Sequence, residues 1–243
     1  LSFSSGVATA NVTLYKAETI GAGNLSILSS GSVDNISGVS SSDLVVSHAA
    51  IDHLELSFSS PQTVGVGFDI TLTAVDQWGN VVLNKDSELS ASTVNWSGAS
   101  NSGGGQSPQW DTSISFTNGV GVAQNNILVK AETIASGNLS VNSSGGIVVT
   151  GVSTEALVVN EPSVDHFELS FTSPQTVGVS FNITVSAKDQ YNNTLTTYDT
   201  DLNDSTYTWS GASNSPNNTP PSFPSTLSFS SGVATANVTL YKA

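Results

Sequence analysis

The sequence predicts an all-β fold in which a unit of about seven strands recurs along the chain. The stretch LSFSSGVATANVTLYKA at Leu1–Ala17 returns unchanged at Leu227–Ala243, which sets a spacing of 226 between the two copies. A diverged copy, one letter longer, lies midway at Ile114–Ala131, so the underlying period is half of that spacing, 113. Within each repeat apolar and polar residues alternate and no segment has helical periodicity, which is typical of half-buried antiparallel strands.

The repeat fixes where the units begin. The stretch Asp52–Asp76 agrees with Asp165–Asp189 at 18 of 25 positions. We therefore expect one complete unit at residues 52–164, preceded by the C-terminal part of a unit at residues 1–51 and followed by the N-terminal part of another at residues 165–243. A unit of this length can bury its own core.

The alternation also places the strands. Clusters of Gly, Asn, Ser and Pro separate the apolar runs at the short spacing that is typical of two packed sheets, and this favours a sandwich over a barrel with a large cavity. The expected strands are His53–Phe58, Phe68–Val75, Ser113–Thr117, Val120–Lys130, Asn138–Val141, Ala156–Val159 and Phe181–Lys188.

One turn can be predicted from stereochemistry. The segment Asp76–Asn80 becomes Asp189–Asn193 in the next unit, and Gly79 is replaced by Asn192. Asn is the residue that best tolerates the left-handed region after Gly. A positive φ is therefore expected at this position, as hairpin turns require.

The aromatic residues recur with the same period. We expect these rings to pack in the core or over the ends of the units, and a platform of exposed rings for stacking sugars is the alternative. The recurring pairs are Trp78 and Tyr191, Trp96 and Trp209, and Trp110 and Phe223.

Five stretches of the complete unit carry a resemblance to a known family: they are His53–Ser57, Pro61–Leu72, Ala74–Asn80, Ser115–Val120 and Leu157–Val159. In this order they resemble the immunoglobulin-like, filamin-type repeats of long prokaryotic surface proteins. The resemblance implies tandem seven-stranded β-sandwiches that are exported and occur in adhesins, sheaths, surface layers or filaments, and it implies no activity. The stretches Ala99–Gln109 and Ala212–Pro224 are longer than the family pattern, so we expect a protruding loop there.

Composition excludes several classes of function. Five lysines stand against 19 acidic residues, giving a net charge of −14, so there is no basic surface for nucleic acid or anionic lipid. Without cysteine, neither a disulfide framework nor a thiolate metal site can form. No apolar run reaches the roughly 18 residues of a membrane-spanning helix. The chain opens on Leu1 without an initiator Met or a signal peptide, which we interpret as a piece of a longer protein.

Histidine gives no sign of a catalytic site. His53 and His166 occupy the same position in successive units and His48 lies just before a boundary, so none is unique. A Ser, His and Asp arrangement could be assembled around His53 only because serine is abundant. We therefore expect no enzyme activity and no cofactor, and we expect Asp52 and His53 to form hydrogen bonds at a junction between units.

One acidic stretch begins like a calcium-binding loop. Asp199–Asn203 has oxygen ligands at alternate positions, but the sixth position is Asp204 where Gly is expected, and the twelfth is Ser210 where a bidentate Glu belongs. The sister stretch Asp86–Ser90 keeps less of the pattern. A solvated acidic edge is therefore favoured over a metal site; the alternative, a calcium-stiffened adhesin, would lose thermal stability on chelation.

Glycosylation is the strongest chemical signal. Eleven of the 21 asparagines stand in the sequence Asn-x-Ser/Thr, nearly twice the number that random placement would give. Occupied sites would place the protein outside the cell or at its surface. Alternation on an exposed strand face also produces this pattern, as at Asn11 and Asn182. The sites are Asn11, Asn24, Asn35, Asn95, Asn138, Asn142, Asn182, Asn192, Asn203, Asn217 and Asn237.

The linker between units indicates a stiff array. Residues 157–165 contain no flexible Gly/Ser tether, and Pro162 restricts the backbone there. We expect units that stack head to tail as a structural subunit of an extracellular, glycosylated filament, sheath or stalk, with other copies of the chain as partners. The alternative is a spacer in a large cell-surface adhesin or surface-layer protein.

The incomplete units complement each other. Residues 165–243 lack the strands that the equivalent of residues 18–51 would supply from the next copy. Either one long polypeptide continues the array, or separate subunits exchange strands. The two identical copies of LSFSSGVATANVTLYKA favour a long polypeptide. An intact mass near 24.9 kDa under denaturing conditions would contradict it.

Overall fold

Nearly all regular structure in the chain is β-strand, which confirms the predicted all-β class. The computed structural model describes residues 1–30, 36–203 and 205–243. The strands are β1 (Glu18–Ile20), β2 (Ser26–Leu28), β3 (Ser37–Val39), β4 (Leu44–Val46), β5 (His53–Ser57), β6 (Gln62–Thr63), β7 (Gly67–Val75), β8 (Thr93–Ser97), β9 (Phe116–Thr117), β10 (Val120–Ile127), β11 (Glu132–Ile134), β12 (Ser140–Ser144), β13 (Thr150–Ser153), β14 (Leu157–Asn160), β15 (His166–Ser170), β16 (Ser180–Lys188), β17 (Leu202–Asn203), β18 (Thr226–Leu227) and β19 (Val233–Thr239).

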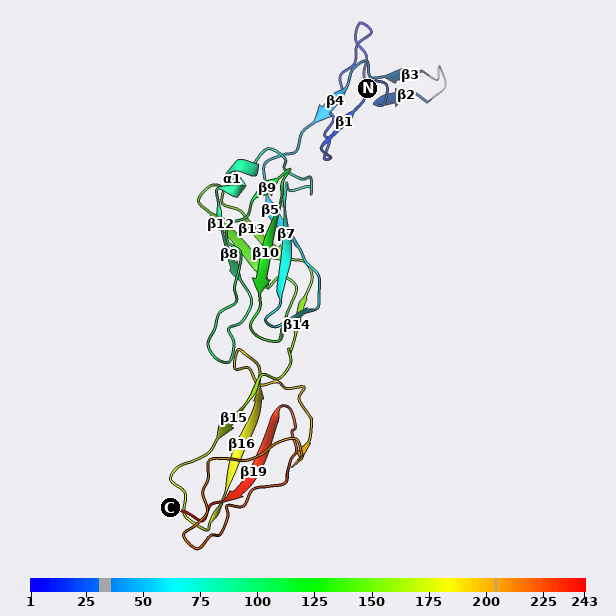
Figure 1. Ribbon diagram of the computed structural model, residues 1–243. Helices are drawn as coiled ribbons and strands as arrows, with labels where there is room; N and C mark the ends of the chain where they lie inside the picture. The colour runs from blue at the N-terminus through cyan, green and yellow to red at the C-terminus, as the bar shows by residue number, and fades with distance from the viewer. Residues whose placement is uncertain (31–35, 204) are drawn as a thin grey trace.

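The chain forms three parts that follow one another in a row (Figure 1). The N-terminal segment, residues 1–51, lies at one end and carries β1 to β4. The middle unit, residues 52–164, carries β5 to β14, and the third unit, residues 165–243, carries β15 to β19 at the other end. The parts therefore meet end to end rather than side by side.

The middle unit contains two sheets. Seven strands form one sheet in the order β8-β12-β13-β5-β7-β10-β9, and three form the other in the order β11-β14-β6. Every pair is antiparallel except β13 with β5 and β14 with β6, which are parallel. These parallel pairs place the last strands of the unit beside its first strands, so the unit closes on itself.

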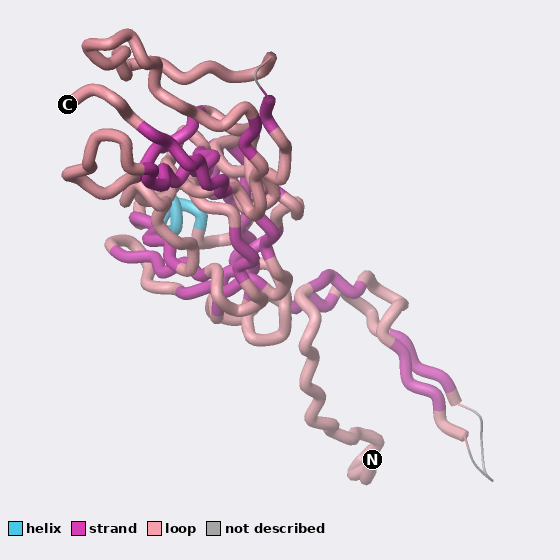
Figure 2. The backbone as a smooth tube through the Cα atoms, turned by 90° about the horizontal axis from the view of Figure 1, so that it is seen from below, coloured by secondary structure: helices cyan, strands magenta, loops and turns pink. Residues whose placement is uncertain are grey.

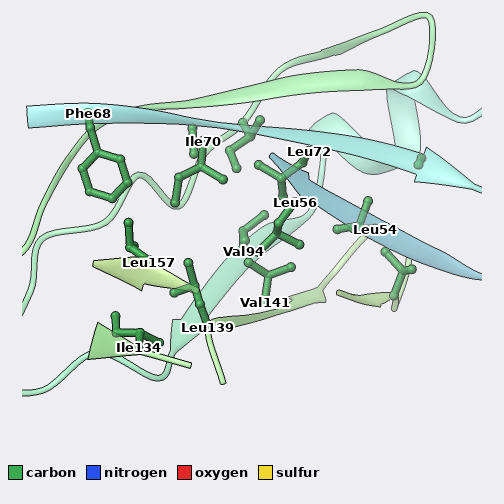
Figure 3. Close-up of a cluster of buried hydrophobic side chains, with 14 of the residues drawn as sticks. Leu54, Leu56, Phe68, Ile70, Leu72, Val94, Ile134, Leu139, Val141 and Leu157 are labelled. Carbon is green, nitrogen blue, oxygen red and sulfur yellow. The ribbon is translucent and has the colours of Figure 1, made fainter. Parts of the chain in front are cut away.

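One hydrophobic core fills the middle unit (Figure 3). Phe68, Ile70 and Leu72 of β7 are buried, because successive side chains of a strand point to opposite faces. Across the core they face Val141 of β12 and Leu157 of β14. The buried faces of the first and last strands of the unit thus meet in a single interior.

The structure confirms most of the expected strands and shortens others. The strand predicted at Phe68–Val75 is β7 and the one at Phe181–Lys188 is β16, each with one residue more. The strand predicted at Val120–Lys130 ends at Ile127, and its register shifts between Ala123 and Asn126. The strands β6, β8, β11 and β13 of the middle unit were not predicted, and each is five residues long or shorter.

A single short helix, α1 (Asp86–Ser90), occurs among the described residues. It occupies the stretch that the sequence suggests is a solvated acidic edge, and it buries Leu89 in the core of the middle unit. No helix in the described ranges is long and apolar enough to cross a membrane.

The third unit repeats the first half of the middle unit. Its sheet has the order β15-β16-β19, which corresponds to β5-β7-β10, and a second pair joins β17 to β18. A smaller core gathers Ile183, Val185, Phe229 and Val238. One face of this core is not covered by any described strand.

The N-terminal segment repeats the second half. In β1 and β4, Ile20 lies opposite Leu44. In β11 and β14 of the middle unit, Ile134 lies opposite Leu157 at the same repeat position. The pair β2 and β3 likewise has the register of β12 and β13. The segment therefore already holds the strand pairs that complete a unit, and Figure 2 shows them extending away from the rest of the chain.

Substitution at the same repeat position should destabilise the middle unit more than the third unit. Leu56 is 7% exposed in the middle unit and Leu169, one period later, is 48% exposed. Leu56→Ala should cost about 2–4 kcal/mol of stability because it opens a cavity. Leu169→Ala in dilute solution should cost less than about 1 kcal/mol because little packing is lost. The two costs are measured by urea unfolding, with hydrogen exchange of the β7 and β16 amides as the readout for each unit. Equal losses of stability in the two variants would contradict the difference in burial between Leu56 and Leu169.

Candidate functional site

The turn that begins at Asp76 is held by its own buried carboxylate. Trp78 N and Asn80 N both donate to Asp76 Oδ1 at 2.9 Å, and Asn80 Nδ2 donates to Oδ2 at 3.0 Å. Gly79 has a φ of 80° and its counterpart Asn192 a φ of 61°, which confirms the predicted left-handed position. The turn therefore presents the Asn80 side chain in a fixed orientation at the end of the middle unit.

Asn80 joins the N-terminal segment to the middle unit. Its Nδ2 donates to the Tyr15 carbonyl oxygen at 2.8 Å, and Ala17 N donates to its Oδ1 at 2.9 Å. The ring of Tyr15 lies beside that of Trp78, with centroids 5.5 Å apart. The aromatic residue of the turn thus contacts the part that precedes its unit, while Trp78 remains 48% exposed.

The same arrangement recurs between the middle unit and the third unit. Asn193 Nδ2 donates to the Val129 carbonyl oxygen at 2.7 Å, and Val129 stands at the repeat position of Tyr15. Asp189 holds the asparagine, since Asn193 N donates to Oδ1 and Asn193 Nδ2 to Oδ2, both at 2.8 Å. Gly103 N donates to Asn193 Oδ1 at 2.7 Å. We call these two contacts the Asn80 joint and the Asn193 joint.

The long loop predicted at Ala99–Gln109 belongs to the Asn193 joint. It protrudes along the chain, where Gly104 N donates to the Tyr191 carbonyl oxygen at 3.0 Å. A Cβ on Gly104 would lie 2.9 Å from that oxygen, and one on Gly103 would lie 2.6 Å from the carbonyl oxygen of Asn192. Both positions require glycine because the backbones of the two units approach so closely.

The linker into the third unit is also held by hydrogen bonds. Glu161 accepts hydrogen bonds from Thr196 N at 2.8 Å and Thr197 N at 3.0 Å, and from the hydroxyls of both threonines. Partial burial raises the pKa of Glu161, but these hydrogen bonds outweigh it and hold the pKa below its usual range. The linker carboxylate therefore stays ionised and ties the chain to the third unit.

The two joints differ at one repeat position. Ala49 N donates to Asp76 Oδ2 at 2.9 Å in the Asn80 joint. Pro162 stands at that position in the Asn193 joint and has no N–H to donate. Glu161, the residue before this proline, accepts hydrogen bonds from Thr196 and Thr197 instead. The second joint is therefore held by a side-chain carboxylate where the first uses a backbone N–H.

Each histidine lies within hydrogen-bonding distance of the residue next to it in the chain. His53 Nδ1 lies 2.9 Å from Asp52 Oδ2, and His166 Nδ1 lies 2.9 Å from Asp165 Oδ2. Both pairs are partly exposed at the start of their units. His48 Nδ1 lies 2.8 Å from the carbonyl oxygen of the next residue.

The acidic residues of the calcium-like stretch support tight turns. Asp199 Oδ1 accepts a hydrogen bond from Ser231 N at 2.6 Å. Asp86, one period earlier, accepts bonds from Asn118 N at 2.7 Å and Gly119 N at 2.8 Å. Ser231 and Asn118 both have a φ of 50°. Within the described ranges, no group of three or more His, Cys, Asp and Glu side chains is placed to hold a metal ion.

The tryptophans stack in pairs. The rings of Trp96 and Trp110 are 5.0 Å apart at 13°, and those of Trp209 and Phe223 are 5.0 Å apart at 6°. Trp96 Nε1 donates to the Asp111 carbonyl oxygen at 2.7 Å, and both tryptophans of the first pair pack against the core. The rings face each other, so they do not form an open row for sugars.

The asparagines in Asn-x-Ser/Thr sequences are exposed at every described site. The buried or half-buried asparagines Asn80, Asn126 and Asn193 lie outside these sequences. Asn35 lies outside the described residues. Two pairs of sites lie directly opposite one another on neighbouring strands: Asn95 opposes Asn142, and Asn182 opposes Asn237.

The sequence predicts the turn but not the asparagine that makes the joint. The available signal was that Asn80 and Asn193 are identical, as are Asp76 and Asp189, although the residue before the asparagine changes from Gly to Asn. The partner positions carry no signal, because the asparagine bonds to backbone oxygens and any residue supplies one.

No family model and no curated protein matches the sequence. Among solved structures, 281 chains match. One is a marsupial T cell receptor, at 12% identity and a TM-score of 0.31 over 88% of this chain. The chain spans 63% of the length of that receptor chain. This likeness is too slight to transfer any property of the receptor.

Removal of the Asn193 side chain should loosen the second joint. Asn193→Ala loses the bonds to Val129 and Gly103 and should cost about 1–3 kcal/mol, chiefly because the carbonyl oxygen of the buried Val129 loses its partner. Small-angle scattering should show a wider range of angles between the middle and third units. Asn84→Ala, an exposed asparagine of the middle unit, is the control; an unchanged scattering profile for Asn193→Ala would contradict the joint.

Stability should fall in acid through Asp76. Burial raises the pKa of Asp76, but the bonds from Ala49, Asn80 and Trp78 hold it at about 2. An unfolded Asp has a pKa of about 3.9, so the carboxylate stabilises the fold above pH about 4 and loses this effect as the pH falls toward 2. Melting temperatures should drop over this window, and less steeply in Asp76→Asn. Parallel curves for the two chains would contradict this assignment.

Proposed function

We infer that the chain is a structural segment of an extracellular, glycosylated filament, sheath or stalk, built from immunoglobulin-like β-sandwiches stacked head to tail. The observation that carries this proposal is the recurrence of one joint. The Asn80 and Asn193 joints use the same Asp and Asn pair against the same backbone position, one period apart. A contact repeated with the period of the sequence is what an array of identical links requires.

The closed middle unit supports the sandwich assignment. Its two sheets enclose one core, and its first and last strands are joined by parallel pairs. A mainly antiparallel two-layer unit with such a core can carry load along the chain, because its strands are tied to one another across the whole unit.

The joints support a stiff array rather than a string of loose beads. Hydrogen bonds are directional, so a fixed Asn side chain that bonds the preceding unit sets the angle between units. The loop tip with Gly103 and Gly104 adds a second contact to the Asn193 joint, and the bonds of Glu161 add a third in the linker. Three separate contacts restrict both bending and twisting.

The exposed Asn-x-Ser/Thr sites support an extracellular role. They are spread over all three parts, whereas the buried or half-buried Asn80, Asn126 and Asn193 stand outside this motif. Glycans on strands with few charges would keep the surface soluble and block pairing between sheet edges. The same surface would suit a spacer in an adhesin or surface-layer protein.

Labelling of intact cells tests the function. Antibodies raised against the folded chain should decorate extended surface structures in electron micrographs of unpermeabilised cells. Label along the full length of a filament or sheath supports a structural subunit. Label confined to a stalk below a separate tip supports the spacer instead. Label found only after permeabilisation would contradict both.

Two glycosylation sites that lie opposite one another on neighbouring strands should not both carry a glycan in the same molecule. Residues directly opposite on antiparallel strands have Cβ atoms about 5 Å apart, too close for two bulky glycans. Asn237 Nδ2 donates to Asn182 Oδ1 at 3.0 Å, so this pair is in contact. In an N-glycosylating host, Asn237→Gln should raise the occupancy at Asn182, while Asn138→Gln should leave it unchanged. Glycopeptide mass spectrometry measures this; double occupancy of most chains would contradict it.

A further inference from the structure

We propose that the open face of the third unit binds strands β1 to β4 of a second copy of this chain, which add the missing strands to its core. This inference rests on the proposed function and names the partner that continues the array. The open face is an apolar groove of about 450 Å³, lined among others by Leu169, Phe171, Trp209 and Leu240.

The middle unit shows what covers this face. Leu54 is 1% exposed and Val64 is 2% exposed, whereas Phe167 and Val177, one period later, are 37% and 46% exposed. In the middle unit β13 pairs with β5 and β14 pairs with β6. These last strands cover the side of the core on which Leu54 and Val64 lie. The third unit exposes apolar side chains at the positions where the middle unit buries them.

The edge of the third unit is also unfilled. In the middle unit β8 pairs with β12 over five residues, from Thr93 to Ser97. Residues 206–210 occupy the same repeat position and form no strand. A strand needs a partner for its backbone N–H and C=O groups, so arrival of the equivalent of β12 should convert this segment into a strand.

The N-terminal segment has the form of the missing piece. Its pairs β1–β4 and β2–β3 already have the registers of β11–β14 and β12–β13. Leu25 and Ile27 are 44% and 56% exposed, whereas their counterparts Leu139 and Val141 are buried. The apolar side chains that fill the core of the middle unit are therefore free to fill another.

A glycine allows the close approach that docking needs. A Cβ on Gly151 would overlap the Leu54 carbonyl oxygen, so β13 can pair with β5 only through a glycine. Gly38 stands at the same position of β3. In the undocked segment a Cβ on Gly38 would meet only the Ile27 side chain, at 3.3 Å, so this glycine is not needed for the local fold.

The registers of the middle unit give those of the docked copy. Gly38 of the second copy should lie opposite Phe167 in a parallel pair, as Gly151 lies opposite Leu54. By the same correspondence, Val46 of the second copy should lie opposite Gln175, as Val159 lies opposite Gln62.

The N-terminal segment of the same molecule cannot reach this groove. The Asn80 joint and the bond from Ala49 to Asp76 hold it at the opposite end of the middle unit. Figure 1 shows the N-terminal segment and the third unit at the two ends of the row. The contact is therefore between different surfaces of two molecules, which gives an open chain of copies rather than a closed dimer.

The arriving copy also brings a second LSFSSGVATANVTLYKA. Its Leu1–Ala17 has the sequence of Leu227–Ala243, which already forms β19 of the third unit. Either copy can fill this position with the same side-chain contacts. The new contacts of the groove begin at Glu18, so they do not depend on which copy supplies β19.

Paired variants of the full chain test the proposal. Gly38→Val places a side chain against the Phe167 backbone and should block the donor end, and Leu169→Glu should block the acceptor end. Val39→Thr is the control, because Val152 at its position is 51% exposed even in the middle unit. Sedimentation over a wide concentration range measures assembly, and hydrogen exchange of β7 amides confirms that each variant is folded.

Four results are expected. The unmodified chain and Val39→Thr should form species that grow with concentration beyond the 24.9 kDa monomer. Gly38→Val and Leu169→Glu should each remain monomeric. An equal mixture of these two should stop at a dimer, since one intact donor meets one intact acceptor. Amides of residues 206–210 should gain protection on assembly of the unmodified chain.

A monomer at every concentration for the unmodified chain would overturn the proposal, and so would unimpaired assembly of either blocked variant. These outcomes leave the structural role standing if antibodies still decorate surface filaments. Conversely, assembly in solution of a chain that is absent from the cell surface would remove the proposed function and keep the docking contact.

Discussion

Burial of the first strands of a unit by its last strands is the constraint on which the rest of the structure depends. In the middle unit β13 and β14 pair with β5 and β6 and cover Leu54 and Leu56. In the third unit β15, the counterpart of β5, is present without this cover, residues 175–176 at the position of β6 form no strand, and Phe167 and Leu169 remain exposed. Apolar burial and backbone pairing are satisfied together, because the strands that cover the core also extend the sheet.

The hydrogen bonds of the joints fix the orientation of one unit relative to the next, which the apolar cores alone would not fix. Apolar contact is non-directional, whereas Asn80 and Asn193 each use both polar atoms of an amide that an aspartate holds in place. The partners are main-chain groups of the preceding part at both joints. An array built this way tolerates change in most side chains near the joint, because the main chain and the Asp and Asn pair carry the contact.

The alternation of residues and the turn signals in the sequence predicted the strands and the turn that depend on nearby residues. Alternation located β7 and β16 to within one residue, and replacement of Gly79 by Asn192 predicted a positive φ that both residues have. The strands β8 and β13 were missed because they are only five and four residues long, and each pairs with a strand distant in the chain, β8 with β12 and β13 with β5. The joints were missed for a related reason, since the asparagines bond to backbone groups, which leave no mark in the sequence.

The two copies of LSFSSGVATANVTLYKA separate what the sequence determined from what tertiary structure decided. In both copies the turn is the same: Ser5 and Gly6 have positive φ, as do Ser231 and Gly232, because Gly and its neighbour set this geometry locally. Only the second copy forms a long strand, β19, which pairs with β16 and buries Val238, whereas Val12 at that position of the first copy is 73% exposed. The same stretch folds differently because a strand requires a neighbour, and only the third unit provides one.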